Sequence, residues 1–248
     1  MSESDDKLIR FLGFPLHSYT LEDTVGSILT SIREKRIVNH VVLNAAKIVY
    51  AKKSPTLEKA ILNSDIINAD GQSIVWGARL LGINIPERVT GIDLFIRLLS
   101  EFEKIDIPVF FLGAKDDILN QLIQRVKSDY PNLKIAGYRN GYFSKEEEIQ
   151  ICEMVNESHA QALFVGISSP KKESFLLDNS SLLKPYFRMG VGGSFDVVAG
   201  HTKRAPKLMQ KIGLEWLYRF YQEPRRMWKR CAVTNTLFLY YLLKEVVK

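Results

Sequence analysis

Short apolar runs that alternate with helical segments constrain the fold of this chain more than any other feature. Segments of about ten to fifteen residues with helical spacing of their apolar positions separate the runs. Runs that are apolar throughout indicate strands buried on both faces, which is typical of a parallel sheet. We therefore predict an α/β, Rossmann-like, mostly parallel sheet covered by helices. The predicted strands are Val38–Leu43, Asp65–Ala69, Pro108–Leu112, Leu133–Ala136, Ala162–Val165 and a last run that closes at Val191.

The spacing of apolar residues also predicts the helices that cover this sheet. Phe11–His17 is predicted as a short strand and turn, and Gly137–Phe143 as a loop. The predicted helices are Thr20–Lys35, Lys47–Ala51, Pro55–Leu62, Gln72–Leu81, Leu94–Phe102, Ile118–Ser128 and Lys145–Glu157, and Ser174–Ser181 is predicted as helix and loop.

A change in composition near Ala205 divides the chain. Its 248 residues are 46% hydrophobic and 25% charged, which is typical of a globular protein with a sizeable core. After the change, Lys and Arg far outnumber acidic residues, and aromatic residues lie between them. We predict a core at residues 1–204 and a helical, basic and aromatic C-terminal appendage at residues 205–248.

Charge and hydropathy indicate where the protein works. The net charge of +6 suits an anionic partner, such as a nucleotide, a nucleic acid or an acidic membrane surface. The first residues are acidic rather than apolar, and no run reaches the roughly 18–20 apolar residues of a membrane span. We interpret the protein as cytoplasmic, with the appendage as its membrane contact.

Glycines follow three of the predicted strands. Glycine lets the backbone approach a ligand closely, and the carboxyl ends of parallel strands are where such sheets bind ligands. A tight turn at a domain corner is the alternative, but the Asp196 carboxylate and a basic cluster nearby favour a ligand site. The glycines are Gly113, Gly166, Gly190, Gly192 and Gly193.

Asp70 follows a predicted strand and precedes Gly71. A carboxylate at a strand end can accept a proton from an attacking hydroxyl. An Asx-type turn or a helix N-cap is the alternative, and for an isolated Asp-Gly pair it is the better interpretation.

Two other segments carry cations suited to phosphate. Lys171 and Lys172 follow Gly166 at a predicted helix start, where backbone N–H groups and ammonium groups suit a diphosphate. Arg88 and Thr90 offer a guanidinium and a hydroxyl, and Arg grips phosphate with two hydrogen bonds. The alternatives are an exposed basic helix end for the first segment and a surface loop before a capped helix for the second.

The appendage interleaves aromatic and basic residues. Such a helix suits the interface of an anionic bilayer. Packing across the core is the alternative. Stacking of single-stranded nucleic acid ranks lower, because no RNA-binding signature accompanies the residues. We therefore predict no nucleic-acid partner.

Metal and cofactor motifs are absent from the sequence. Cys152 and Cys231 lie far apart, and no CxxC or HExxH spacing occurs, which predicts no metal site. No GxGxxG follows an N-terminal strand, which argues against a nicotinamide-dependent enzyme such as an epimerase. We predict no cofactor.

Together these segments resemble the WecG/TagA/CpsF glycosyltransferase family (glycosyltransferase family 26) from about Arg10 to Arg230. The order and spacing of the motifs that carry this resemblance argue against chance. They are Leu43-Asn44-Ala45, Ala69-Asp70-Gly71, Pro86–Gly91 with Asp93, Phe111-Leu112-Gly113, Ser169–Glu173, Gly190–Asp196 with Gly200, Arg204-Ala205-Pro206 and Gly213–Arg219.

The resemblance implies an inverting, metal-independent transfer of a sugar from a UDP-sugar to a lipid-diphosphate-linked saccharide. It implies a role in surface polysaccharide assembly at the inner face of a bacterial membrane. The sequence leaves the oligomeric state open, with a homo-oligomer as one alternative. Asp70 matches the general base, and Asn44 and Arg88 match active-site positions. Asp196 and the glycines before it match the UDP side, to which we also assign Gly113, Gly166 and Lys172. Thr90, Arg219 and Arg226 are assigned to the diphosphate and acceptor side.

Two positions depart from the family pattern. Val42 stands where the family often has Thr, and Lys172 stands where it usually has Gln. A hydroxyl is lost at the first position, and at the second an amide becomes a cation that only donates hydrogen bonds. Both changes bear on which sugar donor binds. A membrane or nucleic-acid adaptor without catalysis is the alternative function, and it would not need Asp70.

Overall fold

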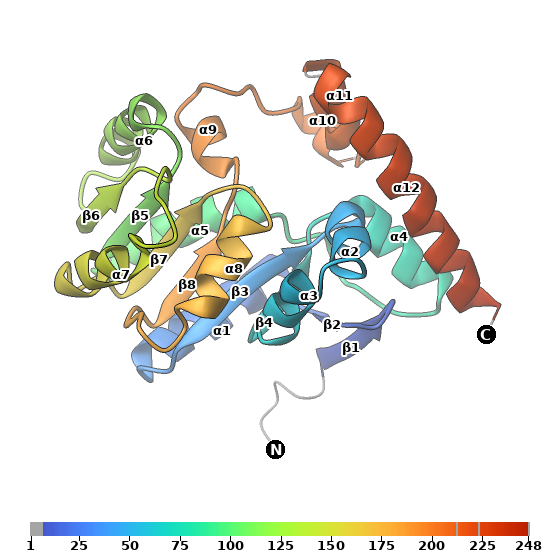
Figure 1. The fold of residues 1–248 in the computed structure, drawn as a ribbon, viewed down its shortest axis with the longest axis horizontal. Coiled ribbons are helices and arrows are strands. Elements are labelled where there is room, and N and C mark those ends of the chain that lie inside the picture. The colour runs from blue at the N-terminus through green and yellow to red at the C-terminus, as the bar shows by residue number, and fades with distance from the viewer. Residues whose placement is uncertain (1–6, 212, 223, 248) are drawn as a thin grey trace.

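The computed structural model describes residues 7–211, 213–222 and 224–247, except for side chains of Lys211, Arg219, Arg225, Arg226, Met227, Lys229, Arg230 and Cys231. Within these residues, six strands pair in parallel in the order β4-β3-β8-β7-β5-β6 (Figure 1). The predicted parallel α/β sheet is therefore confirmed. Its strands are β3 (Val38–Leu43), β4 (Ile66–Ala69), β5 (Val109–Gly113), β6 (Ile135–Arg139), β7 (Ala162–Gly166) and β8 (Phe187–Gly190).

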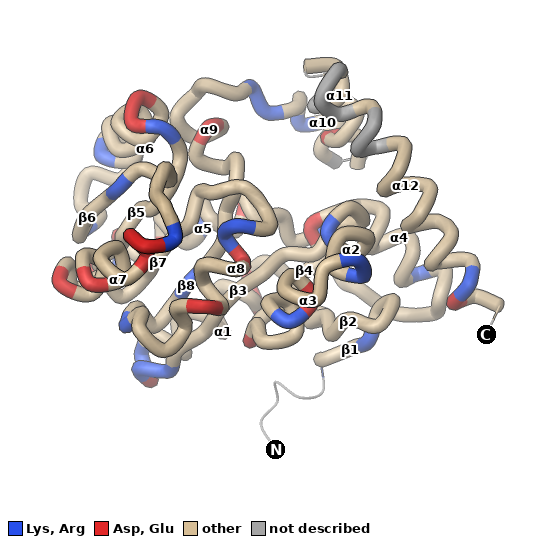
Figure 2. Tube along the Cα trace, in the orientation of Figure 1, with Lys and Arg blue, Asp and Glu red and all other residues tan. Residues whose placement is uncertain are grey.

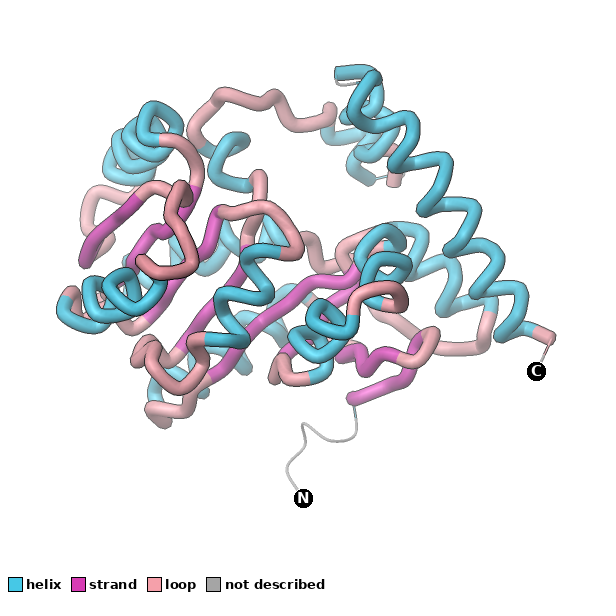
Figure 3. Tube along the Cα trace, in the orientation of Figure 1, coloured by secondary structure: helices cyan, strands magenta, loops and turns pink. Residues whose placement is uncertain are grey.

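Helices cover both faces of the sheet, and Figure 3 shows how they alternate with the strands. Buried side chains on one face meet α1 (Leu21–Arg33), α5 (Gly91–Lys104), α6 (Asp116–Asp129) and α9 (Ser194–Val198). Those on the other face meet α2 (Ala45–Ala51), α3 (Pro55–Leu62), α7 (Glu148–Glu157) and α8 (Lys171–Asp178). A further helix, α4 (Gln72–Leu80), follows β4.

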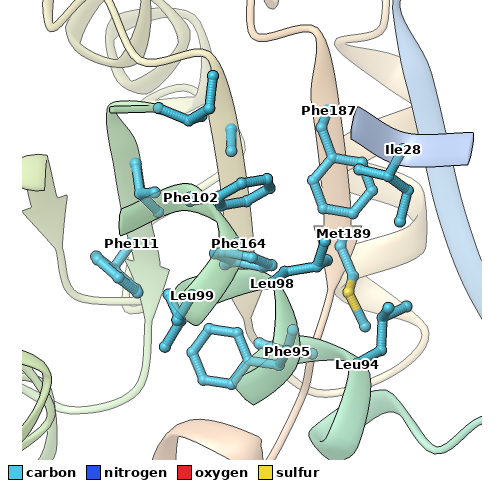
Figure 4. Close-up of a cluster of buried hydrophobic side chains, with 14 of the residues drawn as sticks. Ile28, Leu94, Phe95, Leu98, Leu99, Phe102, Phe111, Phe164, Phe187 and Met189 are labelled. Carbon is cyan, nitrogen blue, oxygen red and sulfur yellow. The ribbon is translucent and has the colours of Figure 1, made fainter. Parts of the chain in front are cut away.

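Aromatic residues of the sheet divide between the two faces, because successive side chains of a strand point in opposite directions. Phe111 and Phe164 pack on the α5 side, whereas Phe110 packs on the α7 and α8 side. Phe95 of α5 meets Phe164 edge to face, with ring centroids 4.7 Å apart (Figure 4). Such pairs add stability beyond the area that they bury. This packing fixes β5 and β7 beneath α5.

Helices α10 (Lys207–Lys211), α11 (Glu215–Gln222) and α12 (Pro224–Val246) follow the core, and α12 runs along one side of it (Figure 1). Phe238 and Leu242 are buried. Phe238 packs against the ring of Phe11, and Leu242 lies over Gly77. Other apolar side chains near the end of α12 are exposed, namely Leu239, Tyr240, Leu243 and Val246. One apolar face of α12 therefore packs on the core, and a second faces solvent. The predicted division at residue 205 stays a prediction.

No helix in the described part of the chain has an apolar stretch long enough to cross a membrane.

The observed elements correct several predicted boundaries. The strand predicted at Leu133–Ala136 is β6, which continues to Arg139 through the start of the predicted loop. Its side chains are only partly buried, because β6 is an edge strand, so the sequence shows no continuous apolar run there. Helix α8 begins at Lys171 rather than Ser174, and the last strand ends at Gly190 rather than Val191.

The segment Phe11–His17 belongs to an antiparallel hairpin rather than to one strand. Its strands are β1 (Leu8–Phe11) and β2 (Phe14–His17). The turn between them uses positive φ at Leu12 and Gly13. Gly13 takes this conformation readily, whereas Leu rarely does, so the sequence signals only half of the turn.

Gly113 and Gly166 end neighbouring strands, and packing explains both. A Cβ on Gly113 would lie 2.5 Å from the backbone of Gly166, and Gly113 also has a φ of +147°. A Cβ on Gly166 would lie 2.2 Å from the ring of Phe195. Side chains are therefore excluded where the ends of β5 and β7 meet α9. The assignment of both glycines to nucleotide binding stays a prediction.

Gly166→Ala is expected to destabilise the protein by about 1–3 kcal/mol, the usual cost of overpacking a core. The added methyl group would have to displace Phe195 from its aromatic cluster. Urea unfolding followed by circular dichroism measures the free energy change. Gly26→Ala in α1 is the matched control, because its Cβ would meet nothing within 4 Å. A helical Ala there should add up to about 1 kcal/mol. Equal stability of the two variants would contradict the packing explanation.

Candidate active site

The carboxyl ends of the strands bring most of the predicted site residues to one edge of the sheet. Asn44 follows β3 and Asp70 follows β4, its neighbour. On the other side of β3, the loop at residues 191–193 follows β8, and Gly166 ends β7. Ligands of parallel α/β sheets bind outside this edge, near the point where the strand order reverses. The edge is therefore the candidate active site.

The half-buried carboxylate of Asp70 faces the start of α5. Its Oδ1 accepts a hydrogen bond from the backbone N–H of Gly91 over 3.3 Å. The N-cap of α4 is Gly71, which has no side-chain cap, so helix capping does not explain Asp70. A carboxylate offers about four lone-pair positions, and the single bond to Gly91 leaves room for an acceptor hydroxyl. The assignment of Asp70 as a general base stays a prediction.

Asn44 is the N-cap of α2, and its Oδ1 accepts from the backbone N–H of Lys47 over 2.9 Å. Its side chain also borders the Asp70 turn, because a Cβ on Gly71 would lie 3.4 Å from that of Asn44. Capping uses the amide oxygen, which leaves the amide NH₂ to donate toward a ligand. Val42 packs beneath Gly91, with its Cγ2 3.6 Å from the position of a Cβ there. It therefore supports the backbone that holds Asp70.

A buried cluster of charges lies beside Asp70. Glu173 of α8 pairs with Lys47 of α2 over 2.8 Å and with Lys172 over 3.6 Å. Figure 2 shows charged residues of both signs at the start of α8. Burial opposes the charge of Glu173, but the two lysines lower the pKa of its carboxyl to about 2. The sequence did not reveal Lys47 as a site residue, because it lies in an otherwise ordinary helical pattern.

Lys171 and Lys172, adjacent in the sequence, point to different places. The ammonium group of Lys171 donates to the backbone carbonyl of Phe143 over 2.8 Å and lies 4.1 Å from the centre of its ring. Lys172 instead lies against the glycine loop after β8, where a Cβ on Gly192 would be 3.1 Å from its Nζ. The expectation that both lysines serve one diphosphate is therefore wrong for Lys171.

Thr90 caps the N-terminus of α5. Its hydroxyl donates to Asp93 over 2.5 Å and accepts from the Asp93 backbone over 3.1 Å. The predicted helix began at Leu94, and the cap shows that α5 begins at Gly91. The assignment of Thr90 to the diphosphate side stays a prediction, since its hydroxyl already has this partner.

Arg88 and Arg204 join the loop before α5 to the C-terminal segment. Arg88 donates to the carbonyl of Gln210 over 3.1 Å and lies 3.7 Å from Glu215. Arg204 makes two bonds to Asp93, at 2.6 and 2.8 Å, and lies 3.6 Å from the same Glu215. Burial alone would raise the pKa of Asp93, but hydrogen bonds from Arg204 and Thr90 hold it below its usual value. Sequence reasoning noted Arg204 without this role and missed Glu215.

The glycine loop and Asp196 lie together at the edge of the sheet. Gly192 has a φ of +55°, in the region that favours glycine. Gly193 precedes α9, and a Cβ on it would lie 3.9 Å from Oδ2 of Asp196. The loop and the carboxylate are thus neighbours, as their spacing predicted, and the assignment to UDP stays a prediction. The side chains of Arg219 and Arg226 lie outside the described residues.

Among the described residues, no three or more His, Cys, Asp and Glu side chains group in a way that could hold a metal ion. Cys152 is buried, and burial raises the pKa of its thiol to about 11, which fits the predicted packed cysteine. The expectations of no metal and no cofactor stay predictions.

The chain has an α/β fold, and its candidate site lies at the carboxyl edge of a parallel sheet. The family described as glycosyl transferase WecG/TagA/CpsF matches residues 9–248, which is almost the whole chain. The chain belongs to this family, as its motifs predicted. It is therefore a glycosyltransferase, and the membership supports a role in polysaccharide biosynthesis.

Proposed function

We propose that this glycosyltransferase transfers a sugar, with inversion, from a UDP-sugar to a lipid-diphosphate-linked saccharide in bacterial cell-surface polysaccharide synthesis. The sugar is N-acetylmannosamine, its uronic acid or a hexose such as glucose. The observation that carries this proposal is the position of Asp70 at the end of β4, held by Gly91 and beside the cations of the site.

The reaction is a single displacement at the anomeric carbon. Asp70 removes the proton of the acceptor hydroxyl, and the oxygen forms a bond to the anomeric carbon as the bond to UDP breaks. The electron pair of that bond leaves with UDP, whose growing charge requires cations nearby. Lys172 and Arg88 are the described side chains suited to this task, because an ammonium and a guanidinium both bind phosphate oxygens.

The exposed apolar face of α12 supports work at a membrane surface. Leu239, Tyr240 and Leu243 lie on it, and the basic residues of the appendage precede them in sequence. Basic residues near an anionic surface contribute about 1 kcal/mol each, and aromatic side chains suit the interface. The proposed place is the inner face of the cell membrane, as a peripheral protein.

A screen of UDP-sugars against the purified protein tests the proposed function. The acceptor is a short-chain lipid diphosphate that carries one sugar, and released UDP is the signal. We expect UDP to be released only when both the acceptor and one particular UDP-sugar are present. No release with any UDP-sugar, together with full transfer from another class of nucleotide sugar, would contradict the proposed donor.

Sugar transfer is expected to survive EDTA, because side-chain cations take the place of a divalent ion at the leaving diphosphate. The assay compares initial rates with and without excess chelator. Asp116 and Asp117 are the adjacent carboxylates that could be taken for a divalent-metal site. However, Asp116 accepts a hydrogen bond from Asn140, and both residues lie in the first turn of α6. A rate that EDTA abolishes and Mg²⁺ or Mn²⁺ restores would overturn this expectation.

A further inference from the structure

The carboxylate of Asp70 depends on the start of α5 for its direction. Among the residues that the structure describes, its one hydrogen-bond partner is the backbone N–H of Gly91, over 3.3 Å. Gly91 is the first residue of α5, so this N–H has no acceptor within the helix and can bind a carboxylate. A shift of the first turn of α5 would therefore move or release Asp70.

The first turn of α5 is held by an arginine from the far end of the core. The guanidinium of Arg204 donates two hydrogen bonds to the carboxylate of Asp93, over 2.6 and 2.8 Å, although the two residues are 111 positions apart in the sequence. Asp93 also accepts from the hydroxyl of Thr90, the N-cap of the helix, over 2.5 Å. A forked arginine–carboxylate pair fixes direction as well as distance. Arg204 thus holds the cap and the first turn in one place.

The backbone around Arg204 is itself held against the same turn. Ala205 is buried, and its carbonyl accepts from the side-chain amide of Gln210 over 2.6 Å. The carbonyl of Gln210 in turn accepts from Arg88, just before α5, over 3.1 Å. The segment that follows the core therefore grips both sides of the α5 start.

The guanidinium of Arg204 is occupied by protein groups. Both of its terminal nitrogens bond to Asp93, and its Nε lies 3.6 Å from Glu215. These contacts direct it toward two carboxylates of the protein. Its arrangement therefore fits the holding of Asp93 better than the binding of a substrate phosphate.

We propose that Arg204 is a positioning residue for sugar transfer: through Asp93 it holds the first turn of α5, and that turn holds Asp70 toward the acceptor. The inference rests on the proposed function and deepens it, because it names a residue on which the proposed base depends. It also gives the segment after the core a route to that base, since Arg204 is where the segment meets α5.

Steady-state rates of Arg204→Gln test the assignment. We expect kcat to fall about 10- to 100-fold, the scale of misplacing a reacting group by about 1 Å, and the affinity for UDP to remain that of the wild type. Arg204→Lys keeps the charge and loses the fork, so it should show a smaller loss of the same kind. Arg97→Gln is the matched control. Arg97 makes a similar pair of bonds to Glu22 further along α5, and its loss should leave the rate unchanged.

Combination with Asp70→Asn distinguishes a positioning role from a general structural one. Once the base is absent, its direction no longer matters, so adding Arg204→Gln or Arg204→Lys should leave the residual rate of Asp70→Asn unchanged. Losses that multiply would overturn the inference, because Arg204 would then act on another part of the reaction. A full rate for Arg204→Gln in the presence of Asp70 would also overturn it.

Hydrogen exchange of the Gly91 amide, followed by NMR, tests the same link without any substrate. We expect this amide to exchange faster in Arg204→Gln than in the wild type, and the amide of Leu98 in the middle of α5 to exchange at an unchanged rate. Unchanged exchange at Gly91 would overturn the inference. Faster exchange in a protein that transfers no sugar from any UDP-sugar would contradict the proposed donor and leave the link from Arg204 to Asp70 standing.

Discussion

Replacing Asp70 with Asn is expected to slow sugar transfer by about 10²- to 10⁴-fold, the usual effect of removing a general base. An amide cannot accept the proton of the acceptor hydroxyl at neutral pH, although it has nearly the shape of the carboxylate. The amide oxygen can still accept from the N–H of Gly91, so the turn before α4 should persist. Initial rates at saturating substrates measure the loss.

Binding of UDP is the control for this variant. Loss of the Asp70 charge removes one of the negative groups that act on Lys172, so UDP should bind at least as well as to the wild type. Asp117→Asn offers a matched substitution on an exposed carboxylate at the start of α6, and it should keep the full rate. Full activity of Asp70→Asn would end its assignment as the base.

Deleting residues 213–248 is expected to reduce transfer to a soluble acceptor analogue by about 10²-fold or more, the scale of losing groups that stabilise a leaving oxyanion. The deletion removes Glu215, the partner that Arg88 and Arg204 share, and with it the helices that follow. It should also release the protein from anionic vesicles. Rate assays and vesicle sedimentation at low salt measure the two effects.

Deletion also uncovers core surface, since Phe238 and Leu242 pack into the cluster around Phe11. Two full-length variants separate the catalytic role of the appendage from its membrane-binding role and leave the core surface covered. Glu215→Gln should lower the rate with the soluble analogue and keep vesicle binding. Leu239→Ser combined with Leu243→Ser, on the exposed face of α12, should weaken vesicle binding and keep that rate.

Other outcomes would redefine the appendage. A truncated enzyme with the full rate on the soluble analogue would show that the segment only anchors the protein. Full-length protein that ignores anionic vesicles at low salt would refute the membrane contact. The exposed apolar face of α12 would then be assigned to an oligomer contact, which the mass of the protein in solution would reveal.

The alternation of apolar strands and helices was enough to predict the sheet, because burial on both faces makes most strand positions apolar. It failed where burial is incomplete, as in the edge strand β6. The same reasoning placed Asp70, Asn44 and the glycines near one another, since the ends of parallel strands share one edge. Sequence could not separate a ligand site from close packing at Gly166, because both require the absence of a side chain.

Tertiary structure decided which charged residues work together. Lys171 and Lys172 are neighbours in the chain, but successive side chains of α8 point in different directions. Lys171 therefore reaches Phe143, and Lys172 reaches the glycine loop. Glu215 meets Arg88 only because α11 returns to the start of α5. The sequence by itself determined the parallel sheet, the edge that carries the candidate site and the position of Asp70, since these follow from local periodicity and strand direction. Only the folded chain determined the partners of each charge, because those depend on contacts between residues far apart in sequence.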